Sequence, residues 1–236
     1  MRRRGSRPGC WKPAAERIGE EELASSAQSV ELLETLCWRR AGGFARLQAH
    51  LARLQASAAR FALPIAEASI IRTLRQADAE YRAAGARVLR VRLVVSGKGV
   101  QVACSAMPEP AAHPQPVALA AMPVRADDER LRHKTTDRRI YEEAAASVPE
   151  GVEPLLWNTD GNVTESGIAN LIYAWEGVRY TPPVSDGLLP GVFRQMLLDR
   201  GEIRERSLPV CDLVAVQELY LVNALRGWRR ARLLPA

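Results

Sequence analysis

The sequence predicts an α+β protein of two domains, and three observations support that prediction. In the first half of the chain, two stretches with apolar residues at helical spacing lie between β-like runs. The second half is dominated by short apolar runs joined by tight turns. Between the halves, residues 106–116 contain four prolines, which is typical of a linker.

The first half is expected to contain two helices and three strands. Apolar residues recur one turn apart over 46–62, which predicts an amphipathic helix ended by Pro64. A second helix is expected at about 66–84, before Gly85. The expected strands of this half are 30–38, 87–95 and 100–104.

The second half is expected to be built mainly of short strands. Asp160-Gly161 and Glu176-Gly177 each lie between β-like runs and predict two hairpins. One helix is expected at about 136–148, and a second after the loop at 187–191. The other expected elements are strands at 117–124, 155–158, 170–175, 178–181, 203–208 and 218–223, with a short helix at 211–217.

The order of these elements predicts how the chain is divided. Residues 1–27 lack periodicity and are expected to be a flexible basic tail. A small N-terminal domain is expected at 28–106, a linker at 107–116, and a larger, β-rich C-terminal domain at 117–236.

The charge argues against a nucleic-acid-binding domain. The chain has a formal net charge of +6. Residues 1–15 hold five basic residues and no acid, so they carry +5 and leave +1 for the remainder. A nucleic-acid interface needs basic residues clustered on a folded face. Nucleic-acid binding through the tail stays an alternative, which a salt-dependent binding measurement would test.

The sequence carries no strong signal for a membrane span, a targeting segment or a metal site. No apolar run approaches the roughly 20 residues that span a bilayer. The first residues do not read as a secretory signal, and a transit peptide is disfavoured because the tail is short and poor in Ser. The four Cys and three His lie apart, without a CxxC pair, so we expect no metal site and a reducing cytoplasm.

Lysine is rare in this sequence, which narrows the search for a nucleophilic amine. Of 33 Lys and Arg residues only three are Lys, and only Lys can readily act as a neutral amine. Lys12 lies in the tail and Lys98 lies between two glycines in a turn, so water should keep both protonated. Lys134 lies among cations before the helix expected at 136–148, which should lower its pKa. A surface lysine in a charged stretch is the alternative.

Three further features suggest a site. Residues 187–194 (GLLPGVFR) form a glycine-containing loop that enters a helix, which suits a phosphate group, although no dinucleotide or Walker motif is present. Glu165 follows a tight hairpin and is either a hydrogen-bonded structural residue or a partner for a ring nitrogen. Arg53 lies in the helix expected at 46–62 and is either an exposed helix arginine or a residue that binds a ligand.

Six stretches, taken in order, resemble the class IV aminotransferases, the fold type IV enzymes that use pyridoxal phosphate. The resemblance covers about residues 29–236, and the HKTTDR and NALRGW stretches favour the aminodeoxychorismate lyases, especially the lyase domain fused behind para-aminobenzoate synthase component I. The stretches are LLETL (32–36), HLARL (50–54), RHKTTDR (132–138), NTDGNVTESGIANLIY (158–173), YTPPVSDGLLPGVFR (180–194) and LVNALRGW (221–228).

The resemblance implies a fold and a role for each matched residue. The fold is that of D-amino-acid aminotransferase, with a small α/β domain and a larger domain that binds pyridoxal phosphate. Lys134 is the catalytic lysine that holds the cofactor as a Schiff base, and Glu165 faces the pyridine nitrogen. Arg53 holds the phosphate, and Thr35 lies near the substrate as a second catalytic residue. The remaining cofactor contacts are the amides of Val192, Phe193, Ala224 and Leu225, with Asn170 and Tyr141 nearby.

The implied activity is conversion of 4-amino-4-deoxychorismate to 4-aminobenzoate and pyruvate, a step of folate biosynthesis, by a cytoplasmic homodimer. Para-aminobenzoate synthase component I is an expected partner. A class IV aminotransferase acting on branched-chain or D-amino acids, and a non-catalytic remnant or partner subunit, are the alternatives. Two departures from the family pattern are the absence of an Asn-Gly turn in residues 1–27 and the presence of Cys37 where Arg is common.

Overall fold

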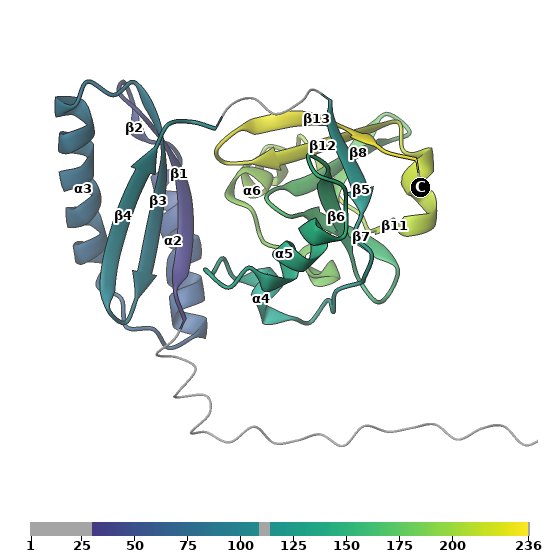
Figure 1. The fold of residues 1–236 in the computed structure, drawn as a ribbon, viewed down its shortest axis with the longest axis horizontal. Coiled ribbons are helices and arrows are strands. Elements are labelled where there is room, and N and C mark those ends of the chain that lie inside the picture. Colours follow the sequence, from purple (N-terminus) through teal and green to yellow (C-terminus); the bar gives the residue numbers. More distant parts are fainter. Residues whose placement is uncertain (1–29, 109–113, 236) are drawn as a thin grey trace, which may run out of the picture.

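The computed structural model describes residues 30–108 and 114–235, which form two bodies with separate sheets (Figure 1). The smaller sheet has the order β2-β1-β3-β4 and is antiparallel throughout. Its strands are β1 (Leu32–Arg39), β2 (Gly43–Phe44), β3 (Val88–Ser96) and β4 (Gly99–Ser105). Helices α2 (Leu47–Arg60) and α3 (Glu67–Ala83) accompany it. The predicted tail lies outside the described residues.

Alternation along β1 gives the small sheet two different faces. Leu32, Leu36 and Trp38 are buried in one core with the apolar stripes of α2 and α3. Leu33 and Thr35 point to the opposite face, where they line the cavity described below. One face of the sheet therefore supports the helices, and the other is available for a site.

The larger sheet has the order β10-β9-β8-β12-β13-β5-β6-β7-β11. An additional pairing of β8 with β7 closes the strands from β8 through β12, β13, β5 and β6 to β7 into a ring. The strands are β5 (Gln115–Leu119), β6 (Glu153–Trp157), β7 (Asn162–Ser166), β8 (Asn170–Trp175), β9 (Val178–Thr181), β10 (Arg204–Glu205), β11 (Leu208–Pro209), β12 (Glu218–Asn223) and β13 (Gly227–Leu233).

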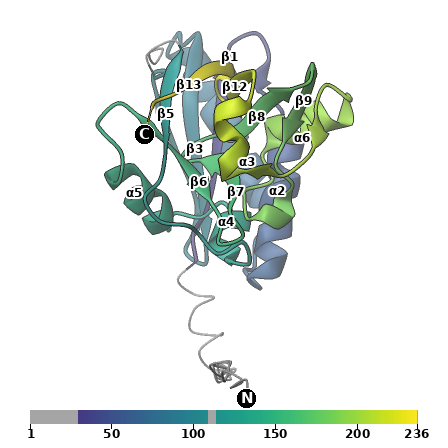
Figure 2. The ribbon, with the colours of Figure 1, turned by 90° about the vertical axis from the view of Figure 1, so that its right-hand side faces the viewer.

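Short helices surround this ring, and its apolar interior forms a separate core. Figure 2, seen from the side of the larger sheet, shows α5 and α6 on opposite sides of it. The helices are α4 (Glu129–Arg132), α5 (Arg139–Ala146), α6 (Val192–Asp199) and the 3₁₀ segments η1 (Val184–Asp186) and η2 (Val210–Ala215). Among residues 30–108 and 114–235, no helix is long and apolar enough to cross a membrane.

The predicted fold class is confirmed, and most predicted elements are present within two or three residues of their expected ends. The strand predicted at 203–208 is two short strands, and the helix predicted at 211–217 is the 3₁₀ segment η2. Four elements were not predicted, namely strands β2 and β13, helix α4 and the 3₁₀ segment η1. Three arginines, two of them adjacent, disguise β13, which is defined by its pairing with β12 and β5.

The boundary between the two bodies falls near the predicted linker. Strand β5 begins at Gln115, inside the segment expected to be a linker at 107–116, because it pairs in parallel with β13 and β6. Residues 109–113 lie outside the described part of the chain. The domain boundaries at 28, 106 and 117 stay a prediction.

Two elements differ more in their bounds: the strand predicted at 117–124 ends at Leu119 as β5, and the helix predicted at 136–148 starts late as α5. The helix begins at Arg139 rather than near residue 136. Residues 133–136 instead lie extended along β1, where the Leu33 amide donates to the Lys134 carbonyl (2.8 Å) and the Thr136 amide donates to the Glu31 carbonyl (2.9 Å). The edge of β1 thus provides main-chain partners that a helical turn here would lose.

Candidate active site

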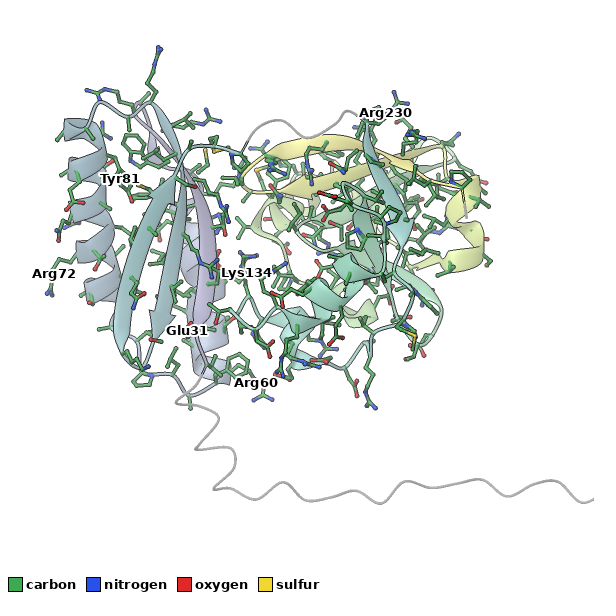
Figure 3. All side chains as sticks on the ribbon, viewed as in Figure 1. Glu31, Arg60, Arg72, Tyr81, Lys134 and Arg230 are labelled. Atoms are coloured by element: carbon green, nitrogen blue, oxygen red, sulfur yellow. The ribbon has the colours of Figure 1, made fainter. Side chains whose placement is uncertain are left out.

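A cavity of about 290 Å³ has walls from both sheets. Every residue that the sequence predicted for the site lines this cavity, although the positions are spread along the chain from 35 to 225. They are Thr35, Arg53, Lys134, Tyr141, Glu165, Asn170, Val192, Phe193, Ala224 and Leu225. Figure 3 shows Lys134 between the small sheet and the larger body. The fold therefore brings the predicted residues together, while their chemical roles stay predictions.

The main-chain carbonyl of Lys134 accepts a hydrogen bond from the Leu33 amide, which fixes the residue on the edge of β1. Burial is the main cause that lowers the pKa of its amine, from 10.5 to about 8, and the positive charge of Arg53 adds to the effect. Of the two causes predicted for this lowered pKa, neighbouring positive charge contributes, whereas a helix N-terminus is wrong, because α5 begins five residues later. Lys98, by contrast, is exposed in the turn between β3 and β4. With a pKa of about 8, roughly a tenth of the Lys134 amine is neutral at pH 7.

Glu165 is the second-last residue of strand β7 and is only 3% exposed. Its Oε1 accepts hydrogen bonds from the Tyr141 hydroxyl (2.9 Å) and the Leu189 amide (3.1 Å). Its Oε2 accepts one from the Asn170 side-chain amide (3.1 Å). Burial raises the pKa of Glu165 to about 7 despite these donors. A cation in the cavity would stabilise this carboxylate, so the residue suits a protonated ring nitrogen.

Asn170 also fixes the loop that enters α6. Its Nδ2 donates to the Leu189 carbonyl (2.9 Å). A Cβ at Gly191 would fall 1.9 Å from Asn170 Oδ1, so only glycine permits this close approach. The N-terminus of α6, with the amides of Val192 and Phe193, is thereby placed against the cavity. The first amides of a helix lack partners within the helix and suit an anion.

Arg53 belongs to a buried charge cluster, so the alternative of an exposed helix arginine is wrong. Its side chain is 11% exposed. Its Nε donates to Glu34 Oε1 (2.8 Å) and its Nη2 to Glu34 Oε2 (2.6 Å), while Nη1 donates to the Pro190 carbonyl (3.2 Å). His50 Nδ1 lies 2.7 Å from Glu34 Oε2. We call Glu34, His50 and Arg53 the buried charge cluster.

Glu34 is ionised in this cluster. Burial alone would raise its pKa, but the charge of Arg53 and the hydrogen bonds from His50 and Arg53 outweigh burial and lower the pKa to about 2. Sequence reasoning missed both Glu34 and His50. A carboxylate inside the apolar run LLETL, and a histidine one helical turn before Arg53, were the signals that could have found them.

The turn after β12 forms another part of the wall. Asn223 Oδ1 accepts hydrogen bonds from the amides of Leu225 (3.1 Å) and Arg226 (2.8 Å). The Leu225 amide is therefore already engaged, and its predicted contact with a phosphate stays a prediction. Arg46, which the sequence did not suggest, stacks on the Phe193 ring at 4.8 Å and donates to the Ala224 carbonyl (3.4 Å).

The remaining wall is strongly cationic, which the sequence also did not suggest. Arg90 and Arg92 are two residues apart on β3 and share its cavity face, and Arg138 and Arg226 line the cavity from the larger body. Among the lining residues, Glu165 is the one carboxylate. The described residues contain no group of three His, Cys, Asp or Glu side chains that could hold a metal ion. The cavity is thus built for anionic groups.

Comparison with known proteins identifies the family. The family profile named amino-transferase class IV matches residues 31–234. A Mesorhizobium loti crystal structure, named provisionally as an amino-acid aminotransferase, is 32% identical with a TM-score of 0.80, over 87% of this chain and 100% of that one. The Pseudomonas aeruginosa 4-amino-4-deoxychorismate lyase shares the fold with a TM-score of 0.70 at 24% identity, over 94% and 89% of the two chains.

A curated relative was also found in Schizosaccharomyces pombe, a protein named provisionally as an aminodeoxychorismate lyase. It is 35% identical over 101 residues, which are 40% of this chain and 44% of that protein. The chain thus matches less than half the length of this relative. The family match across nearly the whole described region, together with the full-length similarity to the Mesorhizobium loti structure, shows that the chain belongs to the class IV aminotransferase family.

Proposed function

We propose that this class IV enzyme, which like the other members of its family depends on pyridoxal phosphate, is an aminodeoxychorismate lyase. The reaction converts 4-amino-4-deoxychorismate to 4-aminobenzoate and pyruvate. The observation that carries the proposal is the cationic wall of the cavity, because this substrate bears two carboxylates. The similarity to the Schizosaccharomyces pombe protein agrees with the proposal over the part that is matched.

The residues around the cavity fit three functional groups of pyridoxal phosphate, namely the aldehyde, the ring nitrogen and the phosphate. The neutral fraction of Lys134 suits the aldehyde, and the buried carboxylate of Glu165 suits the ring nitrogen. Arg53 and the N-terminus of α6 suit the phosphate. These groups meet in one cavity with no competing carboxylate beside Glu165 among its lining residues.

In this proposal the protein moves protons and positions the substrate and the cofactor. Pyridoxal phosphate, when bound, withdraws electrons from the carbon that loses its proton. Lys134, once its amine is free, removes the proton from C4 of the substrate. Glu165 keeps the ring nitrogen protonated. The bond from the ring carbon to the enolpyruvyl oxygen breaks, the ring becomes aromatic, and the departing enolpyruvate takes up a proton to become pyruvate. A positioned general base contributes about 10²–10⁴-fold to such a step.

The wall formed by β1 and β3 favours a dicarboxylate over a branched-chain amino acid. Thr35 on β1 is the register partner of Arg92 on β3, and both line the cavity beside Arg90. An aliphatic side chain placed here would displace water from the guanidinium groups without offering hydrogen bonds to replace it. A carboxylate would form charge-assisted hydrogen bonds with them.

A class IV aminotransferase is the second candidate, and two observations favour it. The same arginines could bind the second carboxylate of 2-oxoglutarate, and the Mesorhizobium loti protein carries an aminotransferase name at 32% identity. A non-catalytic remnant is disfavoured, because the lysine, the buried glutamate and the arginine all line one cavity.

A product assay separates these candidates. The purified protein, supplied with pyridoxal phosphate, is incubated in one arm with 4-amino-4-deoxychorismate and in the other with an amino donor and a keto acid. We expect 4-aminobenzoate and pyruvate in equal amounts in the first arm. Amino-group exchange in the second arm without 4-aminobenzoate in the first would assign an aminotransferase. A colourless protein that takes up no pyridoxal phosphate would overturn both assignments.

The proposal extends to the assembly. The resemblance to the family supports a homodimer in the cytoplasm, with para-aminobenzoate synthase component I as the partner that supplies the substrate. Sedimentation of the purified protein, alone and with component I, tests this extension. A dimer is expected, and a monomer that is nevertheless active would contradict it.

A further inference from the structure

His50 has one ring nitrogen that the protein leaves without a partner. The residue is 2% exposed and lines the cavity. Its Nδ1 contacts Glu34 at 2.7 Å, whereas its Nε2 is buried and has no hydrogen-bond partner among residues 30–108 and 114–235. A buried polar atom without a hydrogen-bond partner destabilises the folded protein. Such an atom on the wall of a binding cavity therefore points to a ligand.

The orphan nitrogen lies at the same end of the cavity as Arg53. His50 and Arg53 are three residues apart on α2 and so share one face of the helix. Both donate to a single oxygen, Glu34 Oε2, at 2.7 and 2.6 Å. The carboxylate thus ties the imidazole to the guanidinium that the family resemblance assigns to the phosphate.

Arg53 alone has few donors left for a phosphate. A guanidinium has five N–H groups. Glu34 takes two of them and the Pro190 carbonyl takes a third, which leaves two. A phosphate ester has three terminal oxygens with several acceptor positions each. A second side-chain donor would complement the two that remain.

We infer that His50 Nε2 is a ligand of the cofactor phosphate. Because Glu34 is a carboxylate and can only accept, Nδ1 carries a hydrogen. Donation from Nε2 as well makes the ring an imidazolium that bridges two anions, Glu34 and the phosphate. This inference rests on the proposed placement of the cofactor and does not depend on whether the enzyme is a lyase or an aminotransferase.

A matched pair of variants tests the inference without measuring activity. The cofactor-free protein is titrated with pyridoxamine 5′-phosphate and with pyridoxamine, which lacks the phosphate. In His50→Asn the amide nitrogen can occupy the position of Nδ1 beside Glu34, but no atom reaches the position of Nε2. In His50→Gln the amide nitrogen can reach the position of Nε2, but the contact with Glu34 is lost.

The inference predicts that His50→Asn weakens binding of pyridoxamine 5′-phosphate by about 10- to 100-fold, with pyridoxamine binding unchanged. His50→Gln should retain most of the affinity for the phosphorylated ligand. The reverse order, or equal weakening of both ligands, would show that His50 only supports Glu34 and would overturn the inference. Absence of any preference for the phosphorylated ligand in the unaltered protein would instead overturn the cofactor placement on which the inference rests. Thermal unfolding of both variants checks that they are folded.

Discussion

Replacing Lys134 with alanine is expected to abolish both covalent capture of pyridoxal phosphate and catalysis. The amine has no substitute nearby, because no other lysine among residues 30–108 and 114–235 lines the cavity. Loss of the base alone should lower kcat by about 10²–10⁴-fold, and loss of the covalent attachment should add to this. Absorption of the protein-bound cofactor near the visible edge and formation of 4-aminobenzoate measure the two effects.

Lys98→Ala is the matched control for this experiment. Lys98 is exposed in the turn between β3 and β4, away from the cavity lining. Its replacement should leave the absorption band and the rate unchanged. If Lys134→Ala retains the band while Lys98→Ala loses it, the assignment of the nucleophile is wrong.

Replacing Glu34 with glutamine is expected to lower the free energy of unfolding of the cofactor-free protein by about 3–5 kcal/mol. The change is nearly isosteric, but it leaves the Arg53 guanidinium in a buried position without its counter-charge. Chemical denaturation of both proteins at neutral pH measures the effect. Asp127→Asn removes the partner of Arg125 in an exposed ion pair and should change stability little.

The effect of Glu34→Gln should also depend on pH in a defined direction. The pKa of Glu34 is lowered from 4.5 to about 2 on folding. A lowered pKa of a carboxyl contributes stability above the unfolded value, and this contribution is lost as the pH falls through the folded value. The difference between the two proteins should therefore be constant above about pH 5 and shrink toward pH 2. A difference that does not change over this range would contradict the assignment of a buried ionised cluster.

Local pattern predicted the elements well where one physical signal dominated. The apolar stripes of α2 and α3 and the alternation along β3 were readable because each buries a single face. Strand β13 was missed because three of its seven residues are arginines. Its sequence, GWRRARL, therefore lacks the regular alternation of apolar and polar residues that marks a strand. Its place depends on pairing with β12 and β5, which come from distant parts of the chain.

The site shows a similar division between local and distant effects. Motif resemblance found Lys134, Glu165 and Arg53, and all three line the cavity. The reasons offered for the low pKa of Lys134 were right for the nearby cations, of which Arg138 is one, but missed the main cause, which is burial and is not visible in the neighbouring residues. Glu34 and His50 left local signals in the sequence, but their pairing with Arg53 depends on contacts that folding creates.

The central claim is that, of the three lysines in this chain, Lys134 alone holds the cofactor. Reduction of the protein with borohydride in the presence of pyridoxal phosphate fixes the cofactor to the amine that binds it, and mass spectrometry of the peptides then locates that amine. We predict the label on the peptide that contains Lys134, with none on those that contain Lys12 or Lys98. A label on either of those two lysines, or on no lysine at all, would contradict the account.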